Sequence, residues 1–245
     1  MNKLKYWFHK VTGRMGSDDL NLYLQKHDVC IGKKTVFFDA KSNFVDVQRP
    51  WMLSIGSYCK ITRGTIILQH DYSRSVLRRV YGDVVDLCKK TTIGNNVFIG
   101  MNSIILMGST IGDNVIIGAG SVVSGTIPSN CVAAGNPARV IRNLDEHYQK
   151  LKERYVDDAT VTAAEFIKRY HRDPTIEEMG AFFPLYLERS REALESNHIR
   201  TNLSGDEENE VVEYFLKSDP VFQNYDAFLE TVHSMAKNAD GVERN

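Results

Sequence analysis

An aliphatic residue recurs every six positions in the middle of the chain, between residues 93 and 125. Six is a multiple of the two-residue period of a strand but not of the 3.6-residue turn of a helix, so these side chains share one face only if the chain is extended. Glycine directly follows several of them, where an extended chain must bend. The aliphatic residues in phase are Ile93, Ile99, Ile105, Ile111, Ile117 and Val123, and the glycines are Gly94, Gly100, Gly112 and Gly118. The pattern predicts short strands that stack as a solenoid, because one such repeat cannot bury its apolar face alone.

The same period runs less regularly through an earlier stretch, whose members are Ile31, Phe37, Ile55, Ile61 and Ile67. Asn43 and Arg49 stand where the period would place aliphatic residues, so we expect polar groups on that wall or bulged out of it. Ile67 and Ile93 are 26 positions apart, which is not a multiple of six, and the residues between them show no period. We therefore expect an excursion loop over residues 69–92, and long loops inside compact repeats are usually functional.

The pattern changes to a helical one after residue 143. Three pairs of residues have the spacing of a capping box and precede apolar residues at helical intervals. These pairs are Asn143 with Glu146, Thr175 with Glu178, and Ser204 with Glu207. The sequence thus predicts three parts: an N-terminal helical segment over residues 1–28, a β-solenoid over 29–143, and a region of several short α-helices over 144–245.

Composition narrows the class of protein. The four cysteines of the 245-residue chain form no CxxC pair, so neither a zinc cluster nor a disulfide framework is indicated. A net charge of −1 gives no case for attraction to nucleic acid. The sequence shows neither a signal peptide nor an apolar run of about 20 residues, which favours a cytoplasmic protein. Residues 1–15 are basic and could dock at an anionic membrane, but packing through Trp7 and Phe8 is the preferred interpretation.

His70 is the one histidine between Ile31 and Asn143. A rigid wall carrying one imidazole at the root of a loop is a suitable setting for a general base, although a lone histidine is more often a structural residue. A metal-dependent hydratase on such a prism would need several imidazole ligands, which this segment cannot supply. The sequence also lacks a GxSxG elbow, an HExxH motif and a phosphate-binding glycine string in the proper context.

The run "IGNNVFIGMNSIILMGSTIGDNVIIGAGSVVSGTIPSNCVAAGNPARVIR" resembles the hexapeptide-repeat acyltransferases, in particular the sugar O-acetyltransferase branch with the galactoside and maltose acetyltransferases. The resemblance covers about residues 28–143, and its "AAGNPARVI" end is highly specific. It implies a mainly β fold, a left-handed parallel β-helix of triangular section with three hexads per coil, followed here by the α-helical C-terminal region. It also implies a homotrimer with active sites between neighbouring prisms, and direct use of acetyl-CoA without a metal.

The resemblance also assigns roles to individual residues. His70, in "ILQHDYS", matches the catalytic histidine, and Asn43 is the nearest counterpart of an asparagine that stabilises the oxyanion. The expected contacts to the acceptor are Asp46, Arg49, Trp51 and Asp71. The expected contacts to CoA are Met101, Ala119 and Ser124 along the wall, with Arg139 and Arg142 at the phosphates. Met101 departs from the serine that some relatives carry there.

The leading hypothesis is an acetyl-CoA-dependent O-acetyltransferase that acts on a sugar or glycan precursor of surface-polysaccharide synthesis. His70 would take the hydroxyl proton as the oxygen attacks the thioester. Two alternatives stay open from the sequence. One is transfer to the amine of an amino sugar or an amino acid, and the other is a non-catalytic β-helix that serves as a scaffold.

Overall fold

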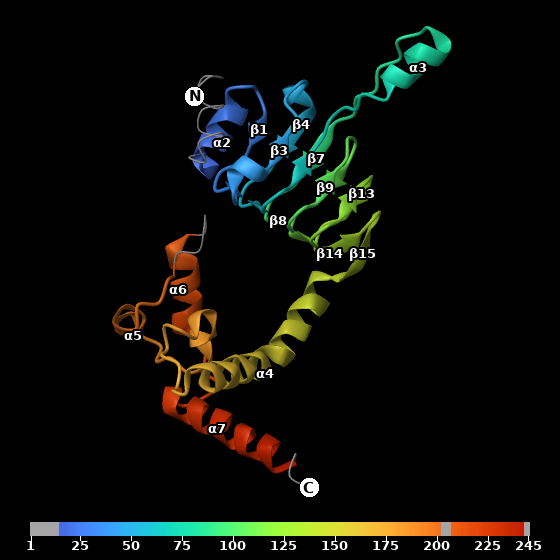
Figure 1. Ribbon diagram of the computed structural model, residues 1–245. Helices are drawn as coiled ribbons and strands as arrows, with labels where there is room; N and C mark the ends of the chain where they lie inside the picture. The colour runs from blue at the N-terminus through green and yellow to red at the C-terminus, as the bar shows by residue number, and fades with distance from the viewer. Residues whose placement is uncertain (1–14, 202–206, 243–245) are drawn as a thin grey trace. The chain divides into compact units, whose positions relative to one another are not determined.

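The computed structural model describes residues 15–201 and 207–242, and they fall into two compact units that meet between His147 and Tyr148. The first unit contains the strands, and the second is helical (Figure 1). The elements of the first unit are α2 (Ser17–Gln25), β1 (Cys30–Ile31), β2 (Val36–Phe37), η1 (Ala40–Ser42), β3 (Phe44–Val45), η2 (Pro50–Met52), β4 (Leu53–Ile55), β5 (Lys60–Ile61), β6 (Ile66–Ile67), α3 (Arg74–Tyr81), β7 (Thr91–Ile93), β8 (Val97–Ile99), β9 (Ile104–Ile105), β10 (Thr110–Ile111), β11 (Val115–Ile117), β12 (Val122–Val123), β13 (Thr126–Ile127), β14 (Cys131–Gly135) and β15 (Ala138–Asn143).

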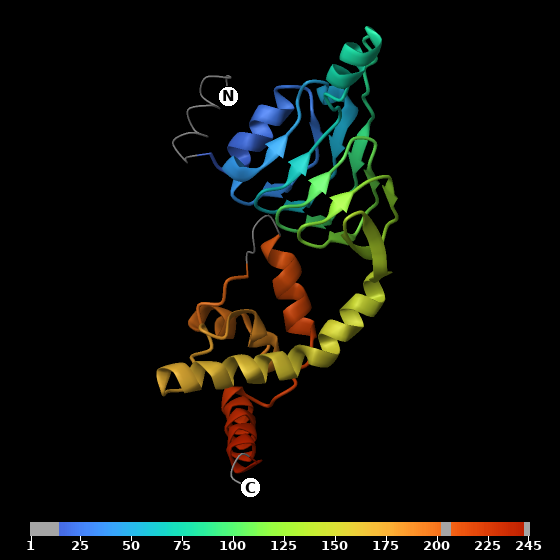
Figure 2. The ribbon, with the colours of Figure 1, turned by 45° about the vertical axis from the view of Figure 1, so that its right-hand side comes forward.

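The strands form a left-handed parallel β-helix, as the sequence predicts. Each coil gives one strand to each of three sheets, which are the three faces of a prism (Figure 2). Sheet A has the order β1-β4-β7-β10-β13, sheet B the order β2-β5-β8-β11-β14-β15, and sheet C the order β3-β6-β9-β12. The described strands pair in parallel except for β15, which turns back antiparallel to β14 and ends the stack.

The aliphatic period supplies the core of the prism. Cross-strand register stacks one buried or half-buried side chain per coil into three rows. The row of sheet A is Ile31, Ile55, Ile93, Ile111 and Ile127, that of sheet B is Phe37, Ile61, Ile99, Ile117 and Ala133, and that of sheet C is Val45, Ile67, Ile105 and Val123. At about 25 cal/mol per Å² of apolar surface, these rows are the main stabilising term of the unit.

The predicted phase of Asn43 and Arg49 is wrong. Val45, not Asn43, takes the aliphatic position of the first coil, since it pairs with Ile67. The residues between Phe37 and Val45 accommodate η1, which lengthens that corner by two residues over the period of six. Arg49 lies outside the strands, just before η2, in a second insertion that separates Val45 from Ile55.

Side-chain ladders hold the corner between sheets A and B. Asn96 donates to Asn114 and Asn114 donates to Asn130, both at 2.9 Å. All three have a positive φ, which asparagine tolerates better than most residues with a side chain. At the open end of the first coil, α2 covers the core with Leu20 and Leu24.

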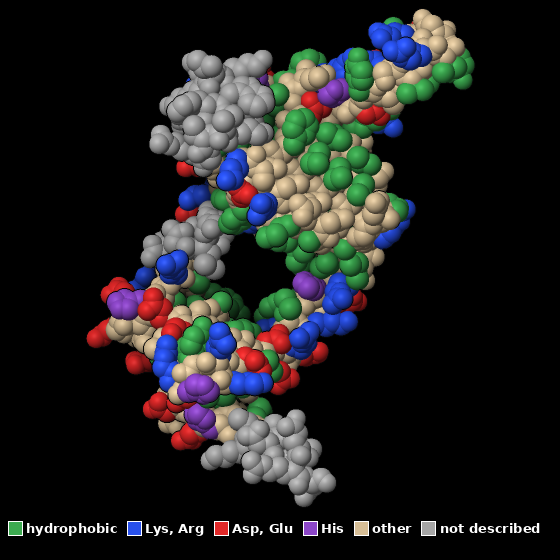
Figure 3. All heavy atoms as spheres, in the orientation of Figure 1, with side chains coloured by type: hydrophobic (Ala, Val, Ile, Leu, Met, Phe, Trp, Pro, Cys, Tyr) green, Lys and Arg blue, Asp and Glu red, His purple; other side chains and the backbone are tan. Residues whose placement is uncertain are grey.

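The excursion between β6 and β7 contains a helix that the sequence analysis did not anticipate. Figures 1 and 2 both show α3 standing away from the prism. None of its residues is buried, and it exposes Val76, Val80 and Tyr81. Figure 3 shows cationic and apolar side chains together on this arm.

The second unit differs from the prediction of several short helices. Its first helix, α4, runs for 27 residues, from Leu144 to Tyr170. The other elements of this unit are η3 (Gly180–Leu185), α5 (Arg191–Ser196), α6 (Glu208–Lys217) and α7 (Tyr225–Val242). Its separate core includes Ala163, Phe183, Phe215 and Phe228.

Two of the three predicted capping boxes can be compared with the described residues. Asn143 accepts from the backbone N–H of Glu146, directly before α4. Thr175 and Glu178 exchange both bonds of a capping box, but they precede a turn and η3 rather than an α-helix. Ser204 lies outside the described residues, as do Trp7, Phe8 and the basic residues up to position 14. Among the described helices, none has the length and apolar character needed to cross a membrane.

Candidate active site

Two irregular segments of the chain leave the prism at the same edge. The first follows Val45 and the second follows Ile67, which are paired neighbours in sheet C. We call this the histidine edge, defined by Asp46 and His70, the residues just beyond those strands. The loop returns beside it, since His70 forms an antiparallel bridge with Cys88.

His70 and Asp46 form a hydrogen-bonded pair. The Nδ1 atom of His70 lies 2.5 Å from Oδ2 of Asp46. The side chain of His70 is 16% exposed and that of Asp46 is 4% exposed, so only the imidazole reaches solvent. Because an ionised carboxylate can only accept, this contact favours the neutral tautomer with its proton on Nδ1, in which Nε2 has the free lone pair. The pair thus has the geometry of a general base with an orienting carboxylate.

This arrangement adds to the role predicted for Asp46. Its Oδ1 accepts from the backbone of Gln48 at 3.0 Å, and its Oδ2 accepts from the backbone of Gln69 at 3.2 Å as well as from His70. The Asp46 carboxylate thus spends most of its acceptor capacity within the chain, and its contact with Nδ1 places it to orient His70. The predicted contact of Asp46 with the acceptor substrate stays a prediction.

Arg49 and Arg74 both bond the carboxylate of Asp86, which ties the excursion loop to the first coil. Burial opposes ionisation of Asp86, but the two guanidinium groups outweigh it and hold the pKa of its carboxyl below the ordinary value. The bond to Asp86 likewise raises the pKa of Arg49. Arg49, predicted to contact the acceptor, thus also anchors the loop.

The other two predicted acceptor contacts have different surroundings. Trp51 is 68% exposed, on the same insertion as Arg49, and its ring is open to a ligand. Asp71 accepts from the hydroxyl of Ser73 at 2.6 Å and from its backbone N–H at 2.9 Å, and these bonds lower the pKa of Asp71. Asp71 therefore shapes the start of the arm just before α3.

Asn43, predicted to stabilise the oxyanion, is a buried residue with hydrogen bonds within the chain. Its Nδ2 donates to the carbonyl oxygens of Phe38 and Asp39, at 3.0 and 3.4 Å, and its Oδ1 accepts from the backbone of Thr65 at 3.0 Å. The side chain is 2% exposed. The Nδ2 bonds thus stay within the first coil, and the Oδ1 bond joins the first coil to the second. The oxyanion role of Asn43 stays a prediction from the resemblance.

Two of the five predicted CoA contacts lie on a different edge, between sheets B and C. Met101 and Ala119 follow β8 and β11, and Met101 accepts through its carbonyl from the backbone of Gly120 at 2.8 Å. Both are exposed, and a Cβ at Gly120 would have open space around it, so this wall is free of obstruction. Ser124 follows β12 instead and lies, exposed, on the side of the histidine edge.

Arg139 and Arg142 share one face of β15 because of a bulge. Residues three apart on a regular strand point to opposite faces. Here Arg139 pairs with Ala134 and Arg142 pairs with Val132, two residues on the same face of β14, and the register shifts between them. The bulge thus brings two guanidinium groups to one side of the prism. This placement is compatible with the binding of CoA phosphates that the resemblance implies.

The two edges are separated by the width of sheet C. Ala119 and Ser124 are five residues apart along extended chain, which corresponds to about 15 Å. The histidine pair and the wall at Met101 and Ala119 therefore occupy different edges of one prism, and Arg139 and Arg142 lie on β15, in sheet B.

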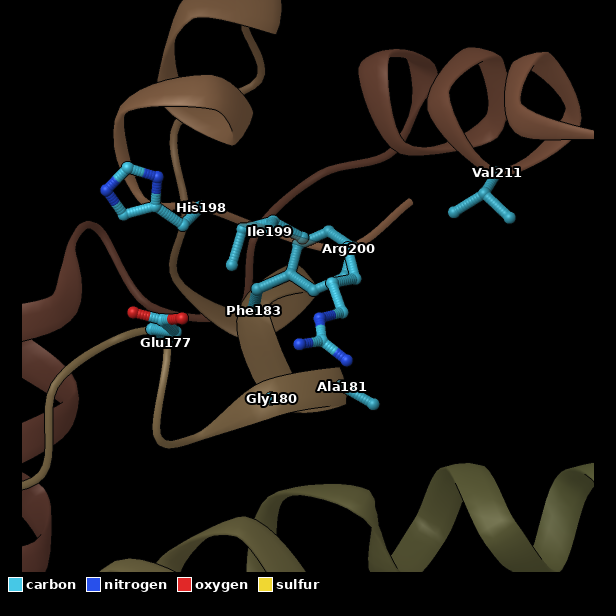
Figure 4. Close-up of a pocket in the computed structure, with 8 residues that line it drawn as sticks. All are labelled: Glu177, Gly180, Ala181, Phe183, His198, Ile199, Arg200 and Val211. Atoms are coloured by element: carbon cyan, nitrogen blue, oxygen red, sulfur yellow. The ribbon is translucent and has the colours of Figure 1, made fainter. Parts of the chain in front are cut away.

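Other parts of the described chain offer less chemistry. No group of three or more His, Cys, Asp or Glu side chains suited to a metal occurs among residues 15–201 and 207–242. The helical unit has a pocket of about 360 Å³, lined by Phe183, Ile199 and Val211 with Glu177 and His198 (Figure 4). The only side-chain pairing of an imidazole with a buried carboxylate among the described residues is that of His70.

Sequence reasoning found His70 but missed its partner. Asp46 lies 24 residues earlier, in a stretch where the period fails, so its position relative to His70 could not be counted in hexads. A usable signal existed nevertheless, because the period fails after Val45 and again after Ile67. Two interruptions that follow the same strand of successive coils must lie at one edge.

Comparison with known proteins agrees with this fold. Residues 90–125 match the family described as Bacterial transferase hexapeptide (six repeats). Protein CapG of Staphylococcus aureus is 38% identical over 151 residues, which are 61% of this chain and 84% of CapG. The galactoside O-acetyltransferase of Escherichia coli (strain K12) is 60% identical over 60 residues, which are 23% of this chain and 30% of that protein.

Among solved structures, a maltose O-acetyltransferase from Clostridium difficile 630 is 36% identical, with a TM-score of 0.39. The match covers 48% of this chain and 59% of that chain. This chain thus spans most of CapG and less than two thirds of the galactoside and maltose enzymes. On the strength of the CapG match and the repeat, the chain belongs to the family of hexapeptide-repeat acyltransferases.

Proposed function

We propose that the protein transfers the acetyl group of acetyl-CoA to a hydroxyl of a sugar or of a glycan precursor in surface-polysaccharide synthesis. The observation that carries the proposal is the His70–Asp46 pair at the root of the excursion loop. The names of two similar proteins, a galactoside and a maltose O-acetyltransferase, support a sugar hydroxyl as acceptor.

The reaction needs one proton to move twice. Nε2 of His70 takes the proton from the acceptor hydroxyl as its oxygen forms a bond to the thioester carbonyl carbon. When the tetrahedral intermediate collapses, the C–S bond breaks and the imidazolium returns that proton to the leaving thiolate. Asp46 holds the ring in the tautomer that leaves Nε2 unprotonated and stabilises the imidazolium between the two steps.

The donor would lie along the edge between sheets B and C. Its thin pantetheine arm would run past Met101 and Ala119, where side chains are exposed and Gly120 leaves space. Arg139 and Arg142, on one face of β15, would bind the phosphates. No resident metal takes part in this scheme.

We infer further that the active site is shared between copies of the chain, as in the homotrimer that the resemblance implies. The donor edge and the histidine edge of one prism are about 15 Å apart across sheet C. A neighbouring prism that sets its donor edge against the histidine edge would close that gap.

Titration calorimetry with acetyl-CoA tests the donor site. Saturable binding near one site per chain is expected, and Arg139→Ala with Arg142→Ala should weaken it. An unaffected double variant would remove the arginines from the site, and no binding at millimolar acetyl-CoA would remove the donor. His70→Ala should then lower turnover by about 10²–10⁴-fold, while His171→Asn, at an exposed position in the helical unit, should leave it unchanged. Loss of the acetyl group in mild hydroxylamine would identify an ester rather than an amide.

A complementation experiment tests the shared site. His70→Ala chains and Arg139→Ala/Arg142→Ala chains are each expected to be nearly inactive. When they are unfolded together in equal amounts and refolded, about one quarter of the sites should combine an intact histidine with intact arginines from a neighbour. If each site lay within one chain, the mixture would recover no activity.

A further inference from the structure

Gln69 is a polar residue in the interior of the prism. It comes two residues after the buried Ile67 and is 0% exposed. Ile105 and Val123 are the equivalents of Ile67 in the third and fourth coils, and the residues two positions after them are Met107 and Gly125. The fold therefore does not require an amide at this position. A buried amide that the coil does not need suggests a local task.

The bonds of Gln69 converge on Asp46. Its backbone N–H donates to Oδ2 of Asp46 at 3.2 Å, and its side-chain Nε2 donates to the backbone carbonyl of Asp46 at 2.7 Å. Gln69 thus holds both the carboxylate and the main chain of the residue that orients His70. Its own carbonyl accepts from the backbone of Lys89 at 3.0 Å, which connects the returning end of the loop to the same point.

The orientation of the amide is fixed by its surroundings. The opposite orientation would set Oε1 against the carbonyl oxygen of Asp46, two acceptors without a proton between them. In the observed orientation Oε1 has no hydrogen-bond partner, although it is buried. Leaving a buried acceptor unpaired is unfavourable, so the bond from Nε2 to Asp46 is retained at the expense of local stability.

We propose that Gln69 is a positioning residue that fixes Asp46 and, through it, the tautomer and orientation of His70. The effect of Gln69 on turnover rests on the proposed function, whereas its effect on the tautomer of His70 does not. Asp46 lies on an irregular segment between β3 and η2, where no regular strand holds the carboxylate. The first coil holds the carboxylate through the backbone N–H of Gln48, and Nε2 of Gln69 adds from the second coil a bond to the main chain of Asp46.

Gln69→Met is the variant that separates positioning from packing. Methionine has a similar length and flexibility and removes only the amide groups. The backbone N–H of residue 69 still donates to Asp46, so the pair is loosened rather than abolished. We expect turnover to fall about tenfold with an unchanged KM for acetyl-CoA, since the donor edge is untouched.

The direct readout is the tautomer of His70. ¹⁵N spectra of histidine-labelled protein contain signals from seven histidines, and His70→Asn identifies the signal of His70 by its absence. Wild-type protein should hold the Nδ1–H tautomer, while Gln69→Met should show exchange between both tautomers. Thr65→Val is the matched control, because Thr65 is buried in the same coil and its hydroxyl donates to the carbonyl of Thr62, away from the pair.

The side-chain amide of wild-type Gln69 provides a second measurement that needs no variant. Its protons should exchange with solvent far more slowly than those of the exposed Gln25. Rapid exchange, or a tautomer of His70 that is the same in wild type and Gln69→Met, would overturn the proposal. If His70→Ala kept full turnover, the proposed function would fail, while the tautomer measurement would still decide the role of Gln69.

Discussion

The regular coils of the prism differ from the interrupted coils in packing and in the side chains that they place at the corners. From Ile93 to Val123 the period of six is unbroken, and every residue of the buried rows is at most 2% exposed. Around Val45 and Ile67 the period is broken, and Val45 is only partly buried. The regular coils provide a rigid wall, and the interruptions place side chains that a regular coil would not carry.

The contrast shows how a repeat acquires chemistry. A side chain in the interior of a regular coil mainly contacts the equivalent residues of the coils on either side, because each position is repeated there. An insertion at a corner frees several residues from this constraint, and two insertions at one edge bring Asp46 and His70 into contact. The following predictions test how sharply stability and function divide between these regions.

Removing a core side chain should cost most in the regular coils. Ile105→Ala is expected to lower the free energy of unfolding by about 3–4 kcal/mol, because its neighbours in sheet C cannot collapse into the cavity. Val45→Ala, in the interrupted coil, should cost about 1 kcal/mol. Urea titrations with hydrogen exchange resolved by peptide measure both, and equal losses would show that the coils do not differ in packing.

The tight corners should tolerate a methyl group poorly. A Cβ at Gly100 would lie 2.4 Å from the backbone nitrogen of Ala119, so Gly100→Ala should cost about 2–3 kcal/mol. Gly125 has open space around it and a φ of 88°, so Gly125→Ala should cost only about 1 kcal/mol, from backbone strain. The same titrations compare them, and a reversed order would contradict the stacking of these corners.

At the histidine edge the larger loss should be catalytic. Asp46→Asn is expected to lower turnover about 10–100-fold. The carboxylate accepts on both oxygens, whereas an amide accepts on one side only and turns an NH₂ group toward a donor on the other side. This change disturbs the tautomer of His70. The KM for acetyl-CoA should not change. Steady-state kinetics give both values, with Asp39→Asn as the control, since Asp39 pairs with Arg63 on the outside of the same coil. Full activity of Asp46→Asn would exclude an orienting role.

The smallest effect is expected at the anchor of the loop. Asp86→Asn removes the charge that both Arg49 and Arg74 bond, and turnover should fall about 2–5-fold with little change in stability, as for other exposed ion pairs. Asp83→Asn is the control, because that carboxylate lies in the same loop and accepts from the backbone N–H of its neighbour Val84 instead of bonding Arg49 or Arg74.

The anchor should also resist acid. Because the pKa of Asp86 is depressed in the folded protein, its contribution is present above the ordinary aspartate pKa of about 3.9 and is lost as the pH falls through the lower, folded value. NMR signals of α3 should therefore stay unchanged from pH 7 to pH 5. Release of α3 within that range would show that Asp86 does not hold the loop.

The extent to which the sequence predicts this protein varies along the chain. The solenoid follows from a period of six, since only extended chain keeps such residues on one face. The helix α3 was not predicted, because eight residues are too few for a helical period to stand out within a long loop, although Gly82 caps its C-terminal end. The full length of α4 was also missed, because much of it is exposed and its apolar pattern is weak.

The candidate site was predicted in part. His70 stands out because its segment has no other histidine, and Arg139 and Arg142 stand out in the "AAGNPARVI" motif. The contacts of Asn43 with Thr65 and of Asp46 with His70 could not be predicted, because each joins residues more than 20 positions apart.

The sequence by itself determined the strands, the buried rows and the identity of the one histidine on the prism, because these depend on local period and composition. Only the tertiary structure decided that Asp46 contacts His70, that Gln69 bonds Asp46, and that Arg139 and Arg142 share one face of β15 in sheet B. The physical reason is that the stacking of coils, and not the distance along the chain, sets which corner residues touch. Where insertions interrupt the period of six, the residues that stack on one another can be known only from the folded chain.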